Sequence, residues 1–377
     1  MVLGAAGVTD GLHILTVNAG SSSLKLRLLG PGDEVVATRD GAPGDDAAAL
    51  REELRRMLAE GPAPDAAAHR VVHGGAELDR ATVVDAGVEA ELERLADLAP
   101  LHNPQAVRAM RALAELTPDL TQVACFDTAF HADLPAAART YALPADWDED
   151  GTPLRRYGFH GLSHAYASRR AAALLGAAPE DLRLVTAHLG AGASLAAVAA
   201  GRSVDTTMGF TPLDGLVMAT RAGSVDPGLL LWLQLRRGLG PEEMERALDR
   251  EAGLLGLAGT ADMREVVARA ADDEDRASLA LDVYIHRLGA SIAAMAAAMG
   301  GLDALVFTGG VGENSAAVRE RACAATAFLG VALDRTANAR GAPDSLLSPP
   351  DARVAVVLVA AREDLEMARQ ARAVLAG

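Results

Sequence analysis

Lysine, aromatic residues and cysteine are all scarce in this sequence. Of its 35 basic residues, 34 are arginine and one, Lys25, is lysine. Aromatic residues make up 3% of the chain, too few for the stacking surfaces on which proteins hold single-stranded nucleic acid. The formal net charge of −16 repels phosphate backbones and anionic lipids. We therefore expect neither a nucleic acid nor a membrane as a partner.

Two cysteines, Cys125 and Cys323, are too few for a disulfide framework. The N-terminus has neither the basic nor the apolar region of a signal peptide. The longest stretch without a charged residue, 184–201, contains three glycines, which favours two buried strands joined by a turn over a membrane-spanning helix. These features predict a cytoplasmic protein.

The distribution of apolar residues predicts a mixed α/β fold, and 377 residues suffice for about two domains. Short apolar runs predict strands at 13–18, 24–29, 69–73, 122–127, 183–189, 304–308 and 353–359. Stretches of helical periodicity lie between them, at 45–60, 103–116, 162–175, 241–252, 272–299, 315–327 and 363–376.

Two segments suggest an internal duplication. Residues 16–24 (TVNAGSSSL) and 186–195 (TAHLGAGASL) each have the pattern of a strand, a polar residue, a tight turn of small residues and a second strand. Small residues let backbone N–H groups approach an anion closely. The pair predicts two related domains that both face a phosphate group.

A third glycine-rich segment, 308–314 (TGGVGEN), follows a predicted strand and opens a helix. Such a turn suits a nucleotide lying against backbone. It matches neither the Walker A pattern nor the dinucleotide-binding fingerprint.

Residues 18–25 (NAGSSSLK) resemble the N-terminal signature of acetate kinases, and the resemblance runs from about residue 13 to the C-terminus. The other blocks of that family follow in order: 69–75 (HRVVHGG), 101–104 (LHNP), 126–131 (FDTAFH), 156–164 (RYGFHGLSH), 208–215 (MGFTPLDG), 220–221 (TR), 262–264 (DMR), 309–314 (GGVGEN) and 362–364 (RED).

The resemblance implies an α/β fold of duplicated actin-like ATPase (ribonuclease H-like) domains with a nucleotide cleft between them. It implies a homodimer that transfers the γ-phosphate of ATP to acetate reversibly by direct in-line displacement, giving acetyl phosphate and ADP. We expect residues 1–11 to be a disordered extension. Residues 12–131 with 365–377 are then the N-terminal, acyl-substrate domain, and 132–364 the C-terminal domain for nucleotide and dimerisation.

Charge neutralisation is the main demand of this reaction, because an acetate carboxylate is a poor nucleophile that repels the γ-phosphate. Arginine binds both carboxylate and phosphate bidentately. The resemblance assigns catalysis to Arg70, Asp127, His160 and Arg221, with Asp127 at the carboxyl end of a predicted strand, where α/β folds place ligand-binding groups. It assigns acetate binding to Arg70, Val72, Leu101, Phe159 and Pro212.

The resemblance also implies a nucleotide site and a metal. Mg²⁺, for which Mn²⁺ can substitute, is expected at Asn18 and Glu363, because this hard ion takes few protein oxygens and keeps several waters. ATP or ADP is expected at Lys25, His188, Leu189, Gly190, Ala191, Gly192, Asp262, Met263, Arg264, Gly310, Val311, Gly312, Glu313 and Asn314.

One position departs from the family pattern. The second phosphate hairpin usually reads His-Leu-Gly-Asn-Gly, whereas here Ala191 replaces the asparagine. The loss removes one side-chain hydrogen bond near the phosphates, a contribution of about 0.5–1.5 kcal/mol. Pyrophosphate as an alternative donor is disfavoured by Gly310 and Val311, because pyrophosphate-using relatives carry larger side chains there.

Two alternatives remain from the sequence. A propionate or butyrate kinase of the same family differs in substrate by one or two methylenes, worth only about 1–3 kcal/mol in a pocket. Val72 favours acetate, because a smaller residue would admit a longer chain. A non-metabolic ATPase switch of the actin or heat-shock class would have no use for the arginine, aspartate and histidine set.

Overall fold

The computed structural model describes residues 11–20, 23–44, 46–99, 102–148 and 153–377, which form two compact units. The described residues of 1–132 belong to the first unit, together with Phe159–Leu162 and Arg362–Gly377. The second unit comprises Asp133–Gly158 and Ser163–Ala361. Residues 1–10 of the expected extension lie outside the described residues. Phe159–Leu162 and residues 362–364, which the sequence placed in the second domain, pack in the first unit.

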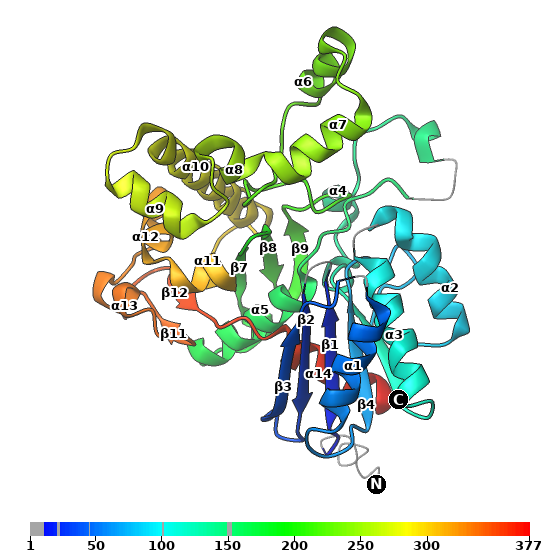
Figure 1. Ribbon diagram of the computed structural model, residues 1–377. Coiled ribbons are helices and arrows are strands. Elements are labelled where there is room, and N and C mark those ends of the chain that lie inside the picture. Colours follow the sequence, from blue (N-terminus) through cyan, green and yellow to red (C-terminus); the bar gives the residue numbers. More distant parts are fainter. Residues whose placement is uncertain (1–10, 21–22, 45, 100–101, 149–152) are drawn as a thin grey trace. The chain divides into compact units, whose positions relative to one another are not determined.

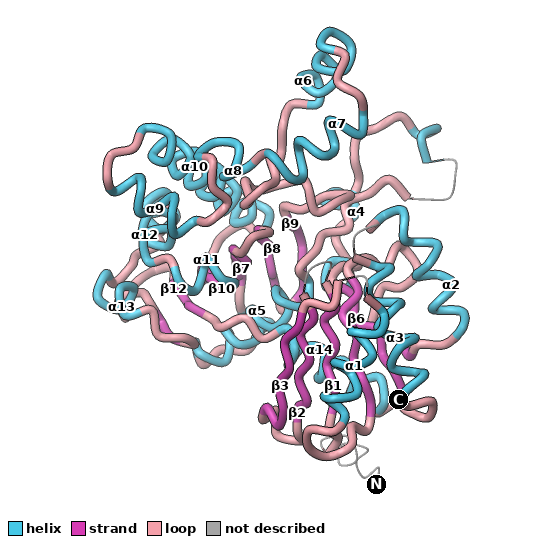
Figure 2. The backbone as a smooth tube through the Cα atoms, viewed as in Figure 1, coloured by secondary structure: helices cyan, strands magenta, loops and turns pink. Residues whose placement is uncertain are grey.

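The first unit is built on a six-stranded mixed sheet in the order β3-β2-β1-β4-β6-β5 (Figures 1 and 2). β1, β4 and β6 run parallel to one another, whereas β2, β3 and β5 join as antiparallel neighbours. The strands are β1 (Ile14–Ala19), β2 (Leu24–Leu29), β3 (Val35–Gly41), β4 (Ala66–Val71), β5 (Thr82–Val83) and β6 (Thr121–Phe126).

Helices cover both faces of this sheet, which explains why β1 and β4 are apolar on both sides. Leu15 and Val17 of β1 face α1 and α3, whereas Ile14 faces α14. Asp46 caps α1 by accepting hydrogen bonds from the backbone N–H groups of residues 48 and 49. The helices are α1 (Ala47–Leu58), α2 (Ala86–Arg94), α3 (Asn103–Leu116) and α14 (Glu363–Leu375).

The second unit repeats the topology of the first. Its sheet order, β9-β8-β7-β10-β12-β11, matches β3-β2-β1-β4-β6-β5 strand for strand, including a two-residue antiparallel edge strand. The predicted duplication and fold class are therefore confirmed. The strands are β7 (Arg183–Leu189), β8 (Ala193–Ala199), β9 (Arg202–Thr206), β10 (Ala304–Thr308), β11 (Ser345–Leu346) and β12 (Ala355–Leu358).

Helix α10 packs against β7, β8 and β9 and against neighbouring helices of the second unit. Among the described residues, it alone is long and apolar enough to cross a bilayer, but half of its apolar window is buried, as in a core helix. The unit's helices are α4 (Ala136–Arg139), most of α5 (Gly161–Leu175), α6 (Pro227–Trp232), α7 (Pro241–Arg246), α8 (Gly253–Ala258), α9 (Met263–Ala271), α10 (Asp275–Ala298), α11 (Gly309–Asn314), α12 (Ala316–Ala325) and α13 (Arg335–Arg340).

Short turns complete both units. Leu233–Arg237 and Ala247–Glu251 are π-helical turns that continue α6 and α7. Single 3₁₀ turns lie at Leu95–Leu98, Ala129–His131, Ala145–Asp148, Pro179–Asp181 and Ala327–Leu329.

Candidate functional site

Three polar side chains gather where the parallel strands of the first unit end. Asn18 lies near the end of β1, Arg70 near the end of β4, and Asp127 directly after β6. Because parallel strands end at the same edge of a sheet, the topology brings these groups together. Glu363, the first residue of α14, joins them from the face that this helix covers.

Arg70 is the centre of this cluster. Its Nε lies 3.2 and 3.1 Å from the two carboxylate oxygens of Asp127, and its Nη2 donates to Oδ2 at 2.6 Å. Nη1 donates to Oδ1 of Asn18 at 3.4 Å, and Nε lies 4.0 Å from the carboxylate of Glu363. The Asp127 carboxylate therefore fixes one edge of the guanidinium, in the side-on geometry that orients an arginine for a second anion.

The charges of this pair are strongly coupled. The Asp127 side chain is 1% exposed and that of Arg70 22% exposed. Burial lowers the pKa of Arg70, but the carboxylates of Asp127 and Glu363 outweigh it, so the pKa is raised and the guanidinium stays charged. Burial raises the pKa of Asp127, and the charge of Arg70 opposes that shift by favouring the carboxylate.

Lys25 lies next to this cluster on the sheet. It is exposed on β2, directly across the antiparallel pair from Asn18 and opposite Asp40 on β3. Directly opposed residues project from the same face with Cβ atoms about 5 Å apart. The lone lysine therefore shares a sheet face with Asn18.

His160 has a left-handed backbone, with φ of 56°. Such a conformation is costly for a residue other than glycine and often occurs at functional sites. The next residue, Gly161, donates its N–H to the carbonyl of Asp127 at 2.8 Å, and a Cβ there would lie 2.2 Å from that carbonyl oxygen. Only glycine allows the chain to approach this closely, so His160 is held beside the Asp127 backbone.

The predicted acetate pocket is only partly defined by the structure. Phe159 is 1% exposed and packs edge-on against His73, with ring centroids 5.5 Å apart. Val72, half-buried, precedes His73 in a loop that Asn103 closes by bonding both backbone groups of His73. Leu101 lies outside the described residues.

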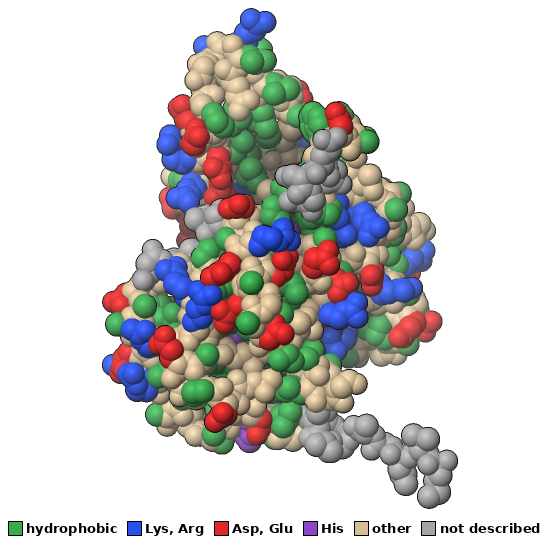
Figure 3. All heavy atoms as spheres, turned by 90° about the vertical axis from the view of Figure 1, so that its right-hand side faces the viewer, with side chains coloured by type: hydrophobic (Ala, Val, Ile, Leu, Met, Phe, Trp, Pro, Cys, Tyr) green, Lys and Arg blue, Asp and Glu red, His purple; other side chains and the backbone are tan. Residues whose placement is uncertain are grey.

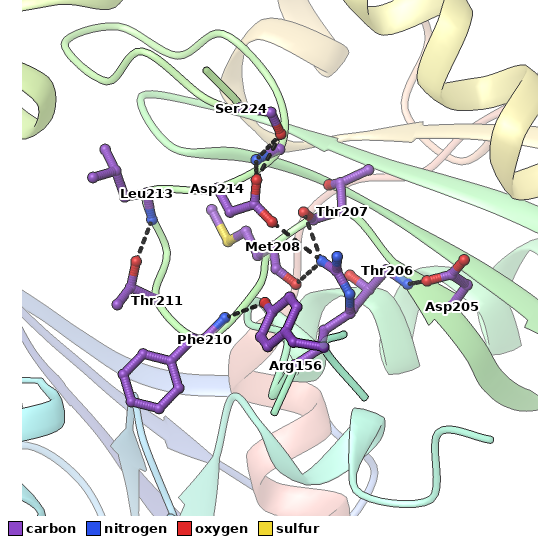
Figure 4. A network of polar contacts seen from close by, with 12 residues as sticks. Arg156, Asp205, Thr206, Thr207, Met208, Phe210, Thr211, Leu213, Asp214 and Ser224 are labelled. Atoms are coloured by element: carbon purple, nitrogen blue, oxygen red, sulfur yellow. Dashed lines mark hydrogen bonds and ion pairs between the residues drawn. The ribbon is translucent and has the colours of Figure 1, made fainter. Parts of the chain in front are cut away.

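Pro212, the remaining residue of that predicted pocket, lies in the second unit on a loop that follows β9. Figure 4 shows Arg156 pointing into this loop, where its Nη1 donates to the carbonyls of Thr207 and Met208 at 3.1 and 2.8 Å. Asp214 accepts from Ser224 at 2.6 Å and lies 3.4 Å from Arg156 (Figure 4). These contacts give the loop a fixed conformation.

The second unit contains a cavity of about 590 Å³, a volume in the range of small-molecule sites. Its wall combines small residues, apolar side chains and the backbone of the hairpin between β7 and β8. The residues that line it are Gly190, Ala191, Ala219, Leu254, Ala261, Asp262, Met263, Arg264, Tyr284, Gly310, Val311, Asn314 and Ser315.

Eight of the residues predicted to bind nucleotide line this cavity: Gly190, Ala191, Asp262, Met263, Arg264, Gly310, Val311 and Asn314. Three others do not line it. Leu189 is fully buried in β7, a Cβ on Gly312 would lie 3.7 Å from that of Leu189, and the Glu313 carboxylate accepts from the N–H of Ala361 at 3.0 Å.

His188 belongs to the same hairpin without lining the cavity. Its Nδ1 lies 2.7 Å from the hydroxyl of Ser163, and its Nε2 lies 3.6 Å from where a Cβ on Gly190 would stand. The imidazole therefore directs one nitrogen toward the turn of the hairpin. Gly192, also in this turn, accepts from the N–H of Gly190 at 2.9 Å through its carbonyl.

Arg221 lies on a loop tied to the hairpin, since the N–H of Ala219 donates to the carbonyl of Ala191 at 3.0 Å. Its Nε donates to the Asp249 carboxylate at 2.7 Å. Sequence reasoning missed Asp249, Ala219, Leu254 and Tyr284, because each lies in an ordinary-looking helix or loop with no local signal of function.

Comparison with known proteins gives one consistent result. The model of the acetokinase family matches residues 44–369. An acetate kinase from Synechococcus sp. is 43% identical and covers 97% of this chain and 100% of its own length. One from Streptomyces griseus is 44% identical, covering 95% of each chain.

Two solved structures are similar along the whole chain. Porphyromonas gingivalis acetate kinase aligns with a TM-score of 0.88 at 35% identity, covering 97% of this chain and 100% of its own. A propionate kinase from Francisella tularensis aligns with a TM-score of 0.87 at 34% identity, covering 95% and 98%.

Proposed function

This chain belongs to the acetokinase family, and from that premise we propose how its residues divide the reaction. The activity is that of an acetate kinase, which phosphorylates the carboxyl group of acetate with ATP as co-substrate. The observation that supports the assignment of roles best is the Arg70–Asp127 pair, a charged guanidinium held side-on at the carboxyl edge of a sheet.

In this proposal the first unit takes the acyl substrate. Arg70 binds the acetate carboxylate, Asp127 holds the guanidinium in place, and Val72 and Phe159 contact the methyl group. The carboxylate oxygen attacks the γ-phosphorus in line, and the bond to the departing ADP oxygen breaks with its electron pair. The acetate carboxylate and the γ-phosphate are both anionic and repel each other. The positive charge of arginine neutralises this repulsion more effectively than water does, so that the two groups can approach.

The second unit takes the nucleotide. The cavity beside the β7–β8 hairpin holds adenosine between Met263, Val311 and the backbone of Gly310. The hairpin supplies backbone N–H groups to the phosphates, and Arg221 donates to the phosphoryl group as its charge develops.

Magnesium fits the first-unit cluster. Among the described residues no three His, Cys, Asp or Glu side chains form a metal site. Asn18 and Glu363 nevertheless offer two oxygen-bearing side chains that both approach Arg70. Mg²⁺ commonly binds one or two protein oxygens and takes the rest from water and phosphates. When bound, it supplies charge neutralisation for the phosphates.

The assay for this function traps acyl phosphate with hydroxylamine. We expect hydroxamate to form from ATP, Mg²⁺ and acetate, with lower kcat/KM for propionate and lower still for butyrate. A preference for propionate would instead favour the alternative of a propionate kinase, the activity named for the Francisella tularensis relative. No hydroxamate from any of the three acids would contradict the function itself. The ATPase-switch alternative lacks support, because the full-length relatives are named acetate kinases.

Replacing Lys25 tests the phosphate role of the lone lysine. Lys25→Arg keeps the charge but replaces a compact ammonium by a larger planar group. Because Lys25 shares a sheet face with Asn18, we expect kcat/KM for ATP to fall at least about tenfold, with an unchanged melting temperature. Steady-state kinetics in ATP measure this, and kinetics like those of the unmodified enzyme would mean that Lys25 is only a surface charge.

Ala191→Asn restores the amide that the family pattern has at this position. Ala191 is exposed and lines the cavity, so an asparagine fits without displacing backbone. We expect KM for ATP to fall by up to about tenfold, the upper range of one net hydrogen bond, while KM for acetate stays constant. An unchanged KM for ATP would indicate that another group already fills this role.

We also propose a cytoplasmic homodimer, consistent with two buried, unpaired cysteines and with an apolar surface on the second unit. Leu229, Leu231, Trp232 and Leu235 on α6 and the following turn are 46–78% exposed. Figure 3 shows hydrophobic side chains exposed among other residues at the top of the view, the height at which α6 lies in Figure 1. Contiguous exposed apolar surface of this kind often marks a protein interface.

Leu235→Glu tests the dimer, because Leu235 is 78% exposed and a charge there would have to be desolvated in an interface. We expect the variant to sediment as a monomer at micromolar concentration. Phe328→Glu is the control, since Phe328 is 72% exposed but lies outside this surface and should leave the dimer intact. Dimers for all three proteins would place the interface elsewhere, and a monomeric original enzyme would contradict the proposed dimer.

A further inference from the structure

One hydrogen bond, on one side of its guanidinium group, holds the side chain of Arg221 in place. Its Nε donates to Oδ1 of Asp249 at 2.7 Å, and within the described part of the chain this is the only hydrogen bond that the group makes. Arginine has five donors in a planar fork. A single acceptor at Nε thus constrains one edge of the group and leaves the two Nη groups for a bidentate anion.

The backbone around the two residues is joined by several further hydrogen bonds. The hydroxyl of Thr220 donates to the carbonyl of Asp249 at 2.8 Å, and the N–H of Ala222 donates to the carbonyl of Leu248 at 3.1 Å. The N–H of Ala252 donates to the carbonyl of Thr220 at 3.0 Å. These hydrogen bonds therefore hold the turn that carries Asp249 and the loop that carries Arg221 in a fixed position relative to each other.

This turn has an unusual backbone. Ala247–Glu251 is a π-helical turn, a conformation that occurs often at functional sites. Gly253, just beyond it, has φ of 59°, and a Cβ there would lie 2.2 Å from the carbonyl of Met218 and 2.9 Å from the nitrogen of Arg221. The close approach places Asp249 within reach of the Arg221 side chain.

We propose that Asp249 is the positioning residue of Arg221. Its carboxylate accepts the Nε–H and thereby aims both Nη groups at the phosphoryl group. The competing role is neutralisation of Arg250, whose Nε lies 3.8 Å from Oδ2 of Asp249 and whose side chain is 61% exposed. The bond to Arg221 is shorter and its partners are 22% and 26% exposed, so water competes with it less. This inference rests on the role proposed above for Arg221.

The test compares Asp249→Ala with Asp249→Asn in the full-length enzyme. The alanine variant loses the acceptor, and we expect kcat to fall about tenfold with KM for acetate and ATP within about twofold. The asparagine variant keeps an acceptor oxygen, so its kcat should stay within about threefold of the original enzyme. Equal losses in both variants, or no loss in Asp249→Ala, would overturn the proposal.

Repeating the substitution in an Arg221→Ala enzyme distinguishes positioning of Arg221 by Asp249 from general structural support by Asp249. In an Arg221→Ala enzyme, adding Asp249→Ala should cause no further loss of kcat, because there is no guanidinium left to aim. A further loss would overturn the proposal. If Arg221→Ala is itself fully active, the role of Arg221 is wrong and the inference fails with it. A poorly active Arg221→Ala beside a fully active Asp249→Ala would contradict the inference alone.

Asp303→Ala is the matched control. Asp303 accepts from Nε and Nη2 of Arg183 at 3.0 and 2.9 Å, in a pair of the same unit that is more exposed, at 42% and 33%. It directly precedes β10, at the end of the sheet opposite the Gly190 hairpin. Its removal should leave kcat unchanged, and an equal loss there would show that any Arg–Asp pair of this unit affects the rate, which would overturn the specific role of Asp249.

Discussion

Arg70→Ala should lower kcat/KM for acetate by about 10²–10³ while leaving the circular dichroism spectrum unchanged. The reason is that the guanidinium, charged and held by Asp127, meets negative charge that grows along the reaction, where one lost donor typically costs this much in rate. Steady-state kinetics with the hydroxamate assay measure it. A variant with near-normal turnover would contradict the assignment of Arg70.

The same substitution has a predictable effect on stability. It removes the cationic partner of the Asp127 carboxylate, whose side chain is 1% exposed in the original enzyme, so the pKa of Asp127 should rise further. A carboxyl group whose pKa is higher in the folded than in the unfolded state destabilises the fold increasingly as the pH rises above the pKa of the unfolded state. The melting temperature of Arg70→Ala should therefore approach that of the original enzyme at acidic pH and fall below it at neutral pH.

Arg27→Ala is the matched control for Arg70→Ala. Arg27 also pairs with an aspartate on the same sheet, donating through Nη1 and Nη2 to Asp40 at 2.5 and 3.0 Å. This pair lies between β2 and β3, and its Asp40 side chain is 62% exposed, so little stability depends on it. Kinetics like those of the original enzyme are expected.

The sequence was sufficient for the elements that carry strong local patterns. The strands at 24–29, 183–189 and 304–308 and the helix at 103–116 were predicted with the bounds that the structure has. β4 was predicted to begin at His69 but begins at Ala66, because three alanines have low strand propensity and are recruited by burial between β1 and β6. The predicted helix at 241–252 ends at Arg246 and continues as a π-helical turn.

The residues of the candidate site likewise divide into those that the sequence indicates and those that only the structure reveals. Asn18 and Asp127 end strands predicted from the sequence, at 13–18 and 122–127, whereas Arg70 is the second residue of the strand predicted at 69–73 and was assigned through the family resemblance. The backbone of His160 could not be predicted, because its positive φ and the neighbouring hydrogen bond from Gly161 to the Asp127 carbonyl depend on a contact between segments distant in sequence. Asp249 was missed for a similar reason: its role depends on a π-helical turn and on a loop 28 residues away in sequence.

Asp127→Ala should lower kcat/KM by about 10² or more, and Asp127→Asn should lose less. Asp127 accepts three hydrogen bonds from Arg70, so alanine leaves the guanidinium without its side-on support. Asparagine retains one acceptor oxygen but turns an amide N–H₂ toward a cation, which keeps only part of the geometry. The order Ala, then Asn, then the original enzyme in rising kcat/KM is the expected result.

The pH profile gives the sharper test of Asp127. Burial raises its pKa, so its protonation should contribute to the loss of activity as pH falls through that value, because the protonated acid supports Arg70 poorly. Asp127→Asn has no proton to gain at this position. Its kcat should therefore be low but should decline less steeply on the acid side than that of the original enzyme. An acid limb that keeps its slope in Asp127→Asn would show that another group controls it and would contradict this role for the protonation of Asp127.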